Sequence, residues 1–357
     1  MIAAHEQTLS NGFAVGWLTL TQPRTLNALT LDMACTALAQ LQQWAERCDI
    51  ACVVLRGEGR AFCAGGDVRQ MRQGILDDTD YCARFFEQEY RLDYTLHRYP
   101  KPVLVWGHGI VMGGGLGLFM GGSHRVVTSS TRMAMPEINI GLYPDVGASH
   151  FLNQLPEGLG LFLGITGCEW NAADALALGI AQILADDAAT AQLPALLAGI
   201  AWSGVSADHH AQLTAALQTL PTAQVEPNLT QCSERILTAC PSLHEAAAAL
   251  PTLNIAEPWF HTALHNFAHG CPVTAHLVEQ QLRRGRSLSL ADIFRMEWEL
   301  SVQCSRHPDF PEGVRAQLVD KDKQPRWQYR SIADVPSAYI DAHFQPPTDR
   351  NPLHDLR

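Results

Sequence analysis

Two acidic residues lie in a stretch whose apolar neighbours make a charge costly. Glu137 follows a proline in MPEINIGLYPDVG, and Asp145 follows a second proline eight positions later. An ionised carboxylate in such surroundings either finds a partner or takes up a proton, so most sequences keep acids out of apolar runs. Carboxyl groups held in this way can act as nucleophile, general base or hydrogen-bond acceptor for a substrate. The alternative is a pair of ordinary turn acids.

Two glycine-rich turns come before these acids. They are GRAFCAGGDVRQM at 59–71 and GHGIVMGGGLGLFMGG at 107–122, and each follows a β-type run and precedes an expected helix. Glycine lets a backbone approach a ligand closely, and two such turns can aim two N–H groups at one oxygen, as an oxyanion hole does. Neither turn has the lysine of a phosphate loop or the spacing of a dinucleotide fingerprint. The alternative is that both are close-packed helix starts.

In the first half of the chain, the segments around these turns alternate between β-type runs and segments with the apolar spacing of a helix. Short β-type runs are expected at 12–20, 50–57, 101–109 and 124–130. The segment 33–48 has apolar residues every three or four positions, which predicts a helix. This strand–turn–helix order predicts an α/β fold in which the loops carry the chemistry.

The second half has a different character, because nearly every segment from about residue 205 reads as a helix. These helices are expected at 206–220, 229–240, 241–250, 257–270, 271–285 and 289–307. The sequence therefore predicts a catalytic core at 1–204 and a helical C-terminal region at 205–357 that packs on the core.

Composition limits the class of protein. The 357 residues are 47% hydrophobic and 17% charged, with a net charge of −11 and no block of Lys or Arg, so nucleic acid and anionic membrane are disfavoured as partners. No apolar run reaches the ~18 residues that span a bilayer, and no secretory signal is visible. Ten scattered cysteines without a CxxC pair favour reduced thiols and a cytoplasmic location.

Taken together, these segments resemble the enoyl-CoA hydratase/isomerase (crotonase) superfamily from about residue 8 to 200. QPRTLNAL resembles the first acyl-CoA-binding loop, and AFCAGGD and GGG resemble the two oxyanion loops. The resemblance implies a crotonase-type spiral of ββα units. It assigns the oxyanion N–H groups to Gly66 and Gly114, and contacts with the CoA portion to the backbone at Ala28 and Ala64.

One position departs from the hydratases of that superfamily. They carry two glutamates, the first of them three residues after the middle glycine of GGG, where this chain has Gly117. Only the second, in the PE element, is present here as Glu137. Hydration of a double bond needs a proton delivered and a water activated together, so the missing acid makes that reaction the weaker hypothesis.

The remaining segments resemble the 3-hydroxyisobutyryl-CoA hydrolase family within that superfamily, over nearly the whole length. The matching stretches are AFCAGGDVR, FFEQEYRLDYTLHRYPKP, MPEINIGLYPDVG and EGVRAQLVDKDKQPRW. The resemblance implies hydrolysis of a short 3-hydroxyacyl-CoA thioester, as in valine breakdown, with Glu89, Gly114, Glu137 and Asp145 contacting or converting the substrate. Glu137 would be nucleophile or general base, and Asp145 would orient water or the 3-hydroxyl. Glu89 would line the acyl pocket or pair with Glu137 through a shared proton, unless it is a solvated helix acid. A non-catalytic CoA-binding scaffold is the alternative from another class.

Three further features favour simpler interpretations. His261, His265 and His269 share a helix face, but no glutamate lies between them as in HExxH, so a polar face is expected and no metal. Cys63 lacks a partner that would activate a thiolate and is expected to pack as a small apolar residue. Basic side chains near the CoA-like loops are candidates for phosphate contacts, namely Arg24, Arg69, Arg72 and Lys101. No cofactor is expected beyond the CoA of the substrate, and a homo-oligomer is left open.

Overall fold

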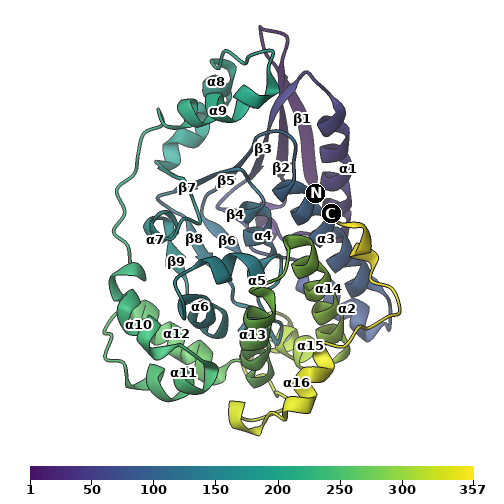
Figure 1. Ribbon diagram of the computed structural model, residues 1–357, viewed down its shortest axis with the longest axis vertical. Helices are drawn as coiled ribbons and strands as arrows, with labels where there is room; N and C mark the ends of the chain where they lie inside the picture. Colours follow the sequence, from purple (N-terminus) through teal and green to yellow (C-terminus); the bar gives the residue numbers. More distant parts are fainter. The chain divides into compact units, whose positions relative to one another are not determined.

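The computed structural model describes residues 1–357 as an α/β protein with two compact units (Figure 1). Unit 1 comprises Met1–Gly66, Arg91–Met133 and Trp170–Thr230. Unit 2 comprises Asp67–Tyr90, Ala134–Glu169 and Gln231–Arg357. The two units therefore alternate along the sequence instead of dividing it once. The expected division of the chain between residues 204 and 205, into a core and a helical region, stays a prediction.

Unit 1 is built on a six-stranded sheet with the order β1-β2-β3-β5-β7-β10. The strands are β1 (Ile2–Thr8), β2 (Ala14–Leu20), β3 (Ile50–Gly57), β5 (Val103–Gly107), β7 (His124–Thr128) and β10 (Ile183–Ala185). β1 pairs antiparallel with β2, and all other neighbours pair in parallel. Parallel strands need crossover connections, which here carry the helices and loops.

A second, four-stranded sheet has the order β4-β6-β8-β9. Its strands are β4 (Ala61–Cys63), β6 (Ile110–Met112), β8 (Arg132–Ala134) and β9 (Trp170–Asn171). β4 and β6 are parallel, so the chain leaves both at the same edge. Because the two glycine turns follow these two strands directly, the pairing places the turns next to each other.

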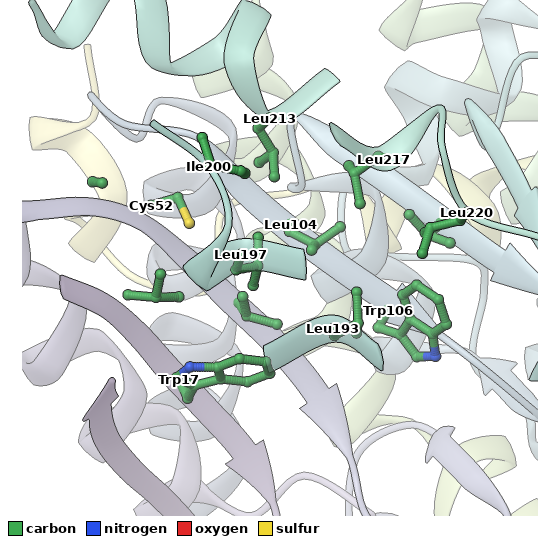
Figure 2. Close-up of a cluster of buried hydrophobic side chains, with 14 of the residues drawn as sticks. Trp17, Cys52, Leu104, Trp106, Leu193, Leu197, Ile200, Leu213, Leu217 and Leu220 are labelled. Carbon is green, nitrogen blue, oxygen red and sulfur yellow. The ribbon is translucent and has the colours of Figure 1, made fainter. Parts of the chain in front are cut away.

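The helices of unit 1 cover its large sheet. They are α1 (Leu31–Glu46), α4 (Gly114–Met120), α7 (Ala172–Ala177), α8 (Leu193–Ala198) and α9 (His209–Leu217), with 3-10 turns η1 (Pro23–Thr25), η4 (Asp187–Gln192) and η5 (Ser206–Asp208). Figure 2 shows leucines of α8 and α9 packed against Trp17 and Trp106 of the sheet. These side chains are almost completely removed from water, which supplies the main stabilisation of this layer.

Unit 2 is helical. Its longer helices are α2 (Val68–Leu76), α6 (Leu159–Thr166), α12 (Pro258–His269), α13 (Pro272–Gly285) and α14 (Leu290–Arg306). The shorter ones are α5 (Ala148–Phe151), α10 (Ser233–Ala239), α11 (Leu243–Ala249), α15 (Asp309–Val314) and α16 (Ser337–His343). Single turns are η2 (Glu137–Ile140), η3 (Leu152–Gln154), η6 (Thr230–Cys232), η7 (Leu250–Thr252), η9 (Ile332–Asp334), η10 (Pro352–Asp355) and the π-helical η8 (Arg315–Val319).

One further helix, α3 (Tyr81–His97), contributes its first part to unit 2 and its second part to unit 1. The expected elements are all present, and α14 at 290–306 differs by a single residue at each end from the expected 289–307. Among the elements that the sequence patterns missed are β1 and α6. β1 is mostly exposed, so it has no apolar alternation, and α6 is buried on every side, so it has no periodic polar face. No helix is both long and apolar enough to cross a bilayer.

Candidate active site

The two glycine turns lie against each other in unit 1. Gly65 has φ +111°, a conformation that favours glycine, and a Cβ built on it would lie 3.4 Å from the oxygen of Met112 and 3.6 Å from the nitrogen of Gly114. A Cβ on Gly115 would lie 2.2 Å from the carbonyl oxygen of Cys63. The second turn can therefore approach the first because Gly115 lacks a side chain, whereas at Gly65 it is the backbone conformation that favours glycine.

This packing brings the two expected oxyanion donors into one region of unit 1. Gly114 is the first residue of α4, and the amides of a first helical turn have no partner within the helix. In the neighbouring loop, the backbone bonds use the amide of Ala64 and the carbonyl of Gly65, not the amide of Gly66. Gly66 is half-buried and Gly114 is buried. Two amides in such a place can stabilise negative charge on an oxygen.

The loop that carries Ala28 is fixed beside the same turn. Leu26 and Asn27 have φ of 55° and 57°, which is uncommon for residues with a side chain. The buried amide of Asn27 holds this shape by donating to the oxygens of Glu58 and Ala61, at 2.9 and 2.8 Å. The amide of Ala64 donates to the oxygen of Leu26 at 3.0 Å, so a ligand at Ala64 would meet its carbonyl group.

In unit 2, Glu137 opens the short helix η2 after Pro136. Its side chain is 5% exposed, and its Oε2 has no hydrogen-bond partner. Burial raises the pKa of Glu137 well above its ordinary value, and the nearby charge of Asp145 raises it further. The carboxyl group is therefore neither a solvated turn acid nor a member of an ion pair. It is held dry with one oxygen available, which is unusual for a purely structural group.

Asp145 is also buried, at 4% exposure, but one of its oxygens is engaged. The hydroxyl of Tyr90 donates to Oδ2 of Asp145 at 2.7 Å. Burial raises the pKa of Asp145 to about 6, while the bond from Tyr90 opposes that rise. Both acids singled out from the sequence are thus withdrawn from water in the same unit, and the charge of Asp145 acts on the ionisation of Glu137.

Three hydroxyl groups continue the contacts of Asp145 into helix α14. The hydroxyl of Tyr90 lies 2.6 Å from Oγ of Ser301, which lies 2.8 Å from the hydroxyl of Tyr143. Tyr143 in turn donates to the carbonyl oxygen of Glu297 at 2.6 Å. Sequence patterns did not single out Tyr90, Tyr143 or Ser301, because a buried hydroxyl looks like any polar residue on a helix until its partners are known.

Glu89 lies on α3 next to Tyr90 in sequence and is 2% exposed. The alternative of a solvated helix carboxylate is therefore wrong. Its negative charge is among the factors that raise the pKa of the Tyr90 phenol, after burial and the charge of Asp145. Glu89 thus belongs to the buried acidic region of unit 2, together with Glu137 and Asp145.

Several other candidates have structural contacts. Lys101 donates to the oxygens of Trp44 and Arg47 at the end of α1, and Arg72 donates to the oxygen of Pro311 at 3.1 Å. Cys63 is buried, as expected for a small apolar residue. The expected polar face of α12 is exposed, with His265 and His269 stacked at 4.3 Å between ring centroids. No group of three or more His, Cys, Asp or Glu side chains is arranged to hold a metal ion.

Comparison with known proteins decides the family. The family profile of enoyl-CoA hydratase/isomerase matches residues 15–344. The chain belongs to this family. Two solved structures each have a TM-score of 0.85: an enoyl-CoA hydratase from Rhodobacter sphaeroides 2.4.1 (29% identical, 97% of both chains) and a carnitinyl-CoA dehydratase from Mycobacterium thermoresistibile (31%, 99% of both). They confirm the α/β fold of crotonase type that the sequence predicts.

Curated members of the family are similar over nearly the full length. The mitochondrial 3-hydroxyisobutyryl-CoA hydrolase of Gallus gallus is 35% identical, over 96% of this chain and 90% of the relative. The mitochondrial human enzyme of that name is 33% identical, over 96% and 89%. The 3-hydroxyisobutyryl-CoA hydrolase 1 of Arabidopsis thaliana is 33% identical, over 92% and 88%. The likeness therefore includes the C-terminal helices as well as the sheets.

Proposed function

We propose that this protein hydrolyses the thioester of a short 3-hydroxyacyl-CoA, with 3-hydroxyisobutyryl-CoA giving 3-hydroxyisobutyrate and CoA as the first substrate to test. The names of the full-length relatives support this substrate. A place in valine breakdown is part of the same proposal. The observation that carries the chemistry is the buried carboxyl group of Glu137, whose Oε2 has no partner. A group of this kind can react with a bound thioester or with a water beside it.

The carbonyl oxygen of the thioester would accept hydrogen bonds from the amides of Gly66 and Gly114. These donors lie on two turns that pack together within unit 1. They stabilise the negative charge that develops on this oxygen during attack, and each such donor typically contributes about 3–4 kcal/mol to lowering the barrier. The backbone at Ala28 and Ala64 would hold the CoA portion.

Glu137 can complete the reaction by either of two routes. As a nucleophile, its carboxylate forms a bond to the carbonyl carbon and the C–S bond breaks, giving a mixed anhydride and CoA thiolate. Water then hydrolyses the anhydride. As a general base, Glu137 takes a proton from water, the hydroxide adds to the carbonyl carbon, and the proton passes to the departing thiolate. Both routes need Glu137 in its ionised form.

Asp145 and Glu89 would recognise the acyl group. One oxygen of Asp145 is fixed by the bond from Tyr90, which orients the carboxyl group toward a partner on its other side. A buried acceptor discriminates strongly in favour of a substrate that brings a hydroxyl group. This is the reason for proposing a 3-hydroxyacyl chain over a plain one, with orientation of the attacking water as the other role of Asp145.

A second candidate, hydration or isomerisation of an enoyl-CoA, follows from the likeness to a solved enoyl-CoA hydratase. Gly117 argues against it, because the position of a second acid is occupied by a glycine. A thiol-release screen separates the candidates. We expect free CoA from 3-hydroxyisobutyryl-CoA and less from 3-hydroxypropionyl- and 3-hydroxybutyryl-CoA. Hydration of crotonyl-CoA without thiol release would favour the hydratase, and binding without any turnover would favour a scaffold.

The proposal also covers the setting of the reaction. Each step uses side chains and amides of this chain, so we propose that no cofactor is required beyond the CoA of the substrate. All ten cysteines are free thiols, which suits a reducing compartment. We propose the cytoplasm, to be tested by cell fractionation, whereas the names of the animal relatives specify mitochondria.

A further inference from the structure

A third buried acid, Glu297 on α14, holds the backbone that follows Asp145. Its side chain is 0% exposed. Its Oε2 accepts a bond from the amide of Gly147 at 2.6 Å, and its Oε1 accepts one from the amide of Ser149 at 2.9 Å. Both carboxylate oxygens are therefore used by one short turn of backbone. Burial raises the pKa of Glu297 to about 8, while its bonds to the two amides oppose that rise.

The backbone held in this way is strained. Val146, directly after Asp145, has φ +54°, and Gly147 has φ +85°. A left-handed conformation is an outlier for a β-branched residue, because its Cβ crowds the backbone. Such conformations persist when the surroundings over-determine them, and they cluster at functional sites. Glu297 helps to hold this conformation, because its two bonds come from the amides of Gly147 and Ser149, directly after Val146.

The same turn has further contacts from the C-terminal helices. Thr274 on α13 donates to the oxygen of Leu142 at 2.7 Å, and Gln281 donates to the oxygen of Pro144 at 2.8 Å. These bonds hold the segment before Asp145, whereas Glu297 holds the segment after it. Among these side chains, Glu297 alone is an acid and alone bonds two amides of the turn. Its removal would free the end of the segment that carries the strain.

We propose that Glu297 is a positioning residue for Asp145: its carboxyl group clamps the strained turn at Val146–Ser149 and so sets the direction of the Asp145 carboxyl group in the reaction. The proposal rests on the proposed function for the identity of the substrate. The hydrogen bonds of Glu297 themselves do not depend on that function. Because reacting groups must be placed closely, a shift of about 1 Å at Asp145 would lower turnover about 100-fold.

Helix α14 also offers a matched control. Glu299 lies two residues further along the same helix, is partly exposed, and accepts a bond from the side chain of Asn351 at 3.0 Å. Glu297→Gln and Glu299→Gln make the same chemical change on one helix. Only the first replaces one acceptor oxygen of the clamp by an NH2 group, which cannot accept the amide bond and faces it donor to donor.

The test is a double-mutant cycle on thiol release, with Glu297→Gln, Asp145→Asn and the double variant, and with Glu299→Gln as control. We expect Glu297→Gln to lower kcat about 10- to 100-fold, with KM changed less than about 3-fold. In the Asp145→Asn background the same change should alter kcat less than about 3-fold, because the group being positioned is already gone. Glu299→Gln should leave kcat within about 2-fold of the unchanged protein.

Two results would overturn the proposal. One is equal kcat for Glu297→Gln and Glu299→Gln. The other is the same fold-loss from Glu297→Gln with and without Asp145, which is the behaviour of a residue that only supports the fold. If Glu297→Gln is unfolded at the assay temperature, the cycle is run with Glu297→Asp, which keeps a carboxyl group but withdraws it by one methylene. The same two results decide.

A further measurement separates this inference from the proposed function. If the unchanged protein releases no thiol from any substrate, the proposed function fails. The clamp is then tested by infrared titration of the Asp145 carboxyl group, identified by its loss in Asp145→Asn. We expect Glu297→Gln to shift the band or the midpoint of its titration. An unchanged band and midpoint would overturn the positioning role.

Discussion

The hydroxyl of Tyr90 lies 2.7 Å from Oδ2 of Asp145, which connects a helix residue to an acid 55 positions later in the chain. The phenol is 0% exposed, and burial raises its pKa well above the ordinary value, so it remains a protonated donor. Asp145 therefore has one oxygen committed to a fixed partner. The pKa of Asp145 therefore depends on the bond from Tyr90 as well as on burial.

Removal of the Tyr90 hydroxyl should change the pKa of Asp145. Tyr90→Phe is expected to raise the pKa of Asp145 above about 6, because the bond from Tyr90 favours the ionised form. Loss of the bond should also cost about 1–3 kcal/mol of unfolding free energy. Infrared titration and urea unfolding measure the two effects. Tyr99→Phe is the control, since that phenol donates only to the oxygen of Leu41, at 2.8 Å. Equal titration of Asp145 in both variants would contradict the prediction.

Replacement of the proposed reacting acid should separate binding from turnover. Glu137→Gln keeps the size of the side chain but cannot act as nucleophile or base, so we expect kcat to fall about 10²- to 10⁴-fold while acyl-CoA still binds. The rate of thiol release measures kcat, and calorimetric titration measures acyl-CoA binding. Glu157→Gln, an exposed acid in the same unit that pairs with Arg286, should behave like the unchanged protein. Undiminished turnover of Glu137→Gln would remove this residue from the mechanism.

The rate should also depend on pH in a definite direction. Burial raises the pKa of Glu137, so the ionised form required by both routes is scarce in acid and grows as pH rises. We expect kcat/KM for thiol release to increase from pH 5 upward, with its half-maximum above the ordinary glutamate pKa of about 4.3. A rate that is already at its plateau at pH 5 would show that Glu137 ionises as if solvated.

Stability should change with pH in the opposite direction. The folded pKa of Asp145 is raised from 3.8 to about 6, so the folded protein holds this proton more tightly than the unfolded chain. Its contribution is complete below pH 3.8 and is lost as pH rises through about 6. The loss is at most about 3 kcal/mol, from the standard conversion of a pKa shift into free energy. The free energy of unfolding in urea should therefore decline less steeply between pH 4 and 7 for Asp145→Asn than for the unchanged protein.

The contact between the two glycine turns should be intolerant of a single methyl group. Gly115→Ala places a Cβ 2.2 Å from the oxygen of Cys63, so the turns must separate and the amides of Gly66 and Gly114 move apart. We expect thiol release to fall by about 100-fold or more, as for the loss of an oxyanion donor. Gly199→Ala, whose Cβ meets nothing closer than 3.4 Å, is the control. Normal activity of Gly115→Ala would place the oxyanion donors elsewhere.

The main features of the fold and part of the site could be predicted from sequence for a local reason. Glu137 and Asp145 stand among apolar residues and prolines, so their burial can be inferred from neighbours in the chain. Strands such as β3 and helices such as α14 carry their own periodicity. Likewise, the close approach at Gly115 follows from a glycine run placed directly after a strand.

Glu297 shows why the rest could not be predicted. In the segment MEWEL it is separated by one tryptophan from Glu299, and both glutamates fit an amphipathic helix equally well. Only the packing of α14 on the 134–169 segment buries the first and leaves the second partly exposed. The left-handed conformation of Val146 is equally hidden, because valine gives no sequence signal for a positive φ. Long-range packing decides both.

The alternation of the two units along the chain restricts how this protein can be shortened. A polypeptide that stops near residue 230 would retain every strand of both sheets and both glycine turns. It would lose Thr274, Gln281, Glu297 and Ser301, whose side chains anchor the peptide from Leu142 to Ser149 and the phenol beside it. Such a fragment would keep both sheets while the buried acid at Asp145 lost these anchors, so the last third of the protein fixes the geometry of residues that precede it by more than a hundred positions.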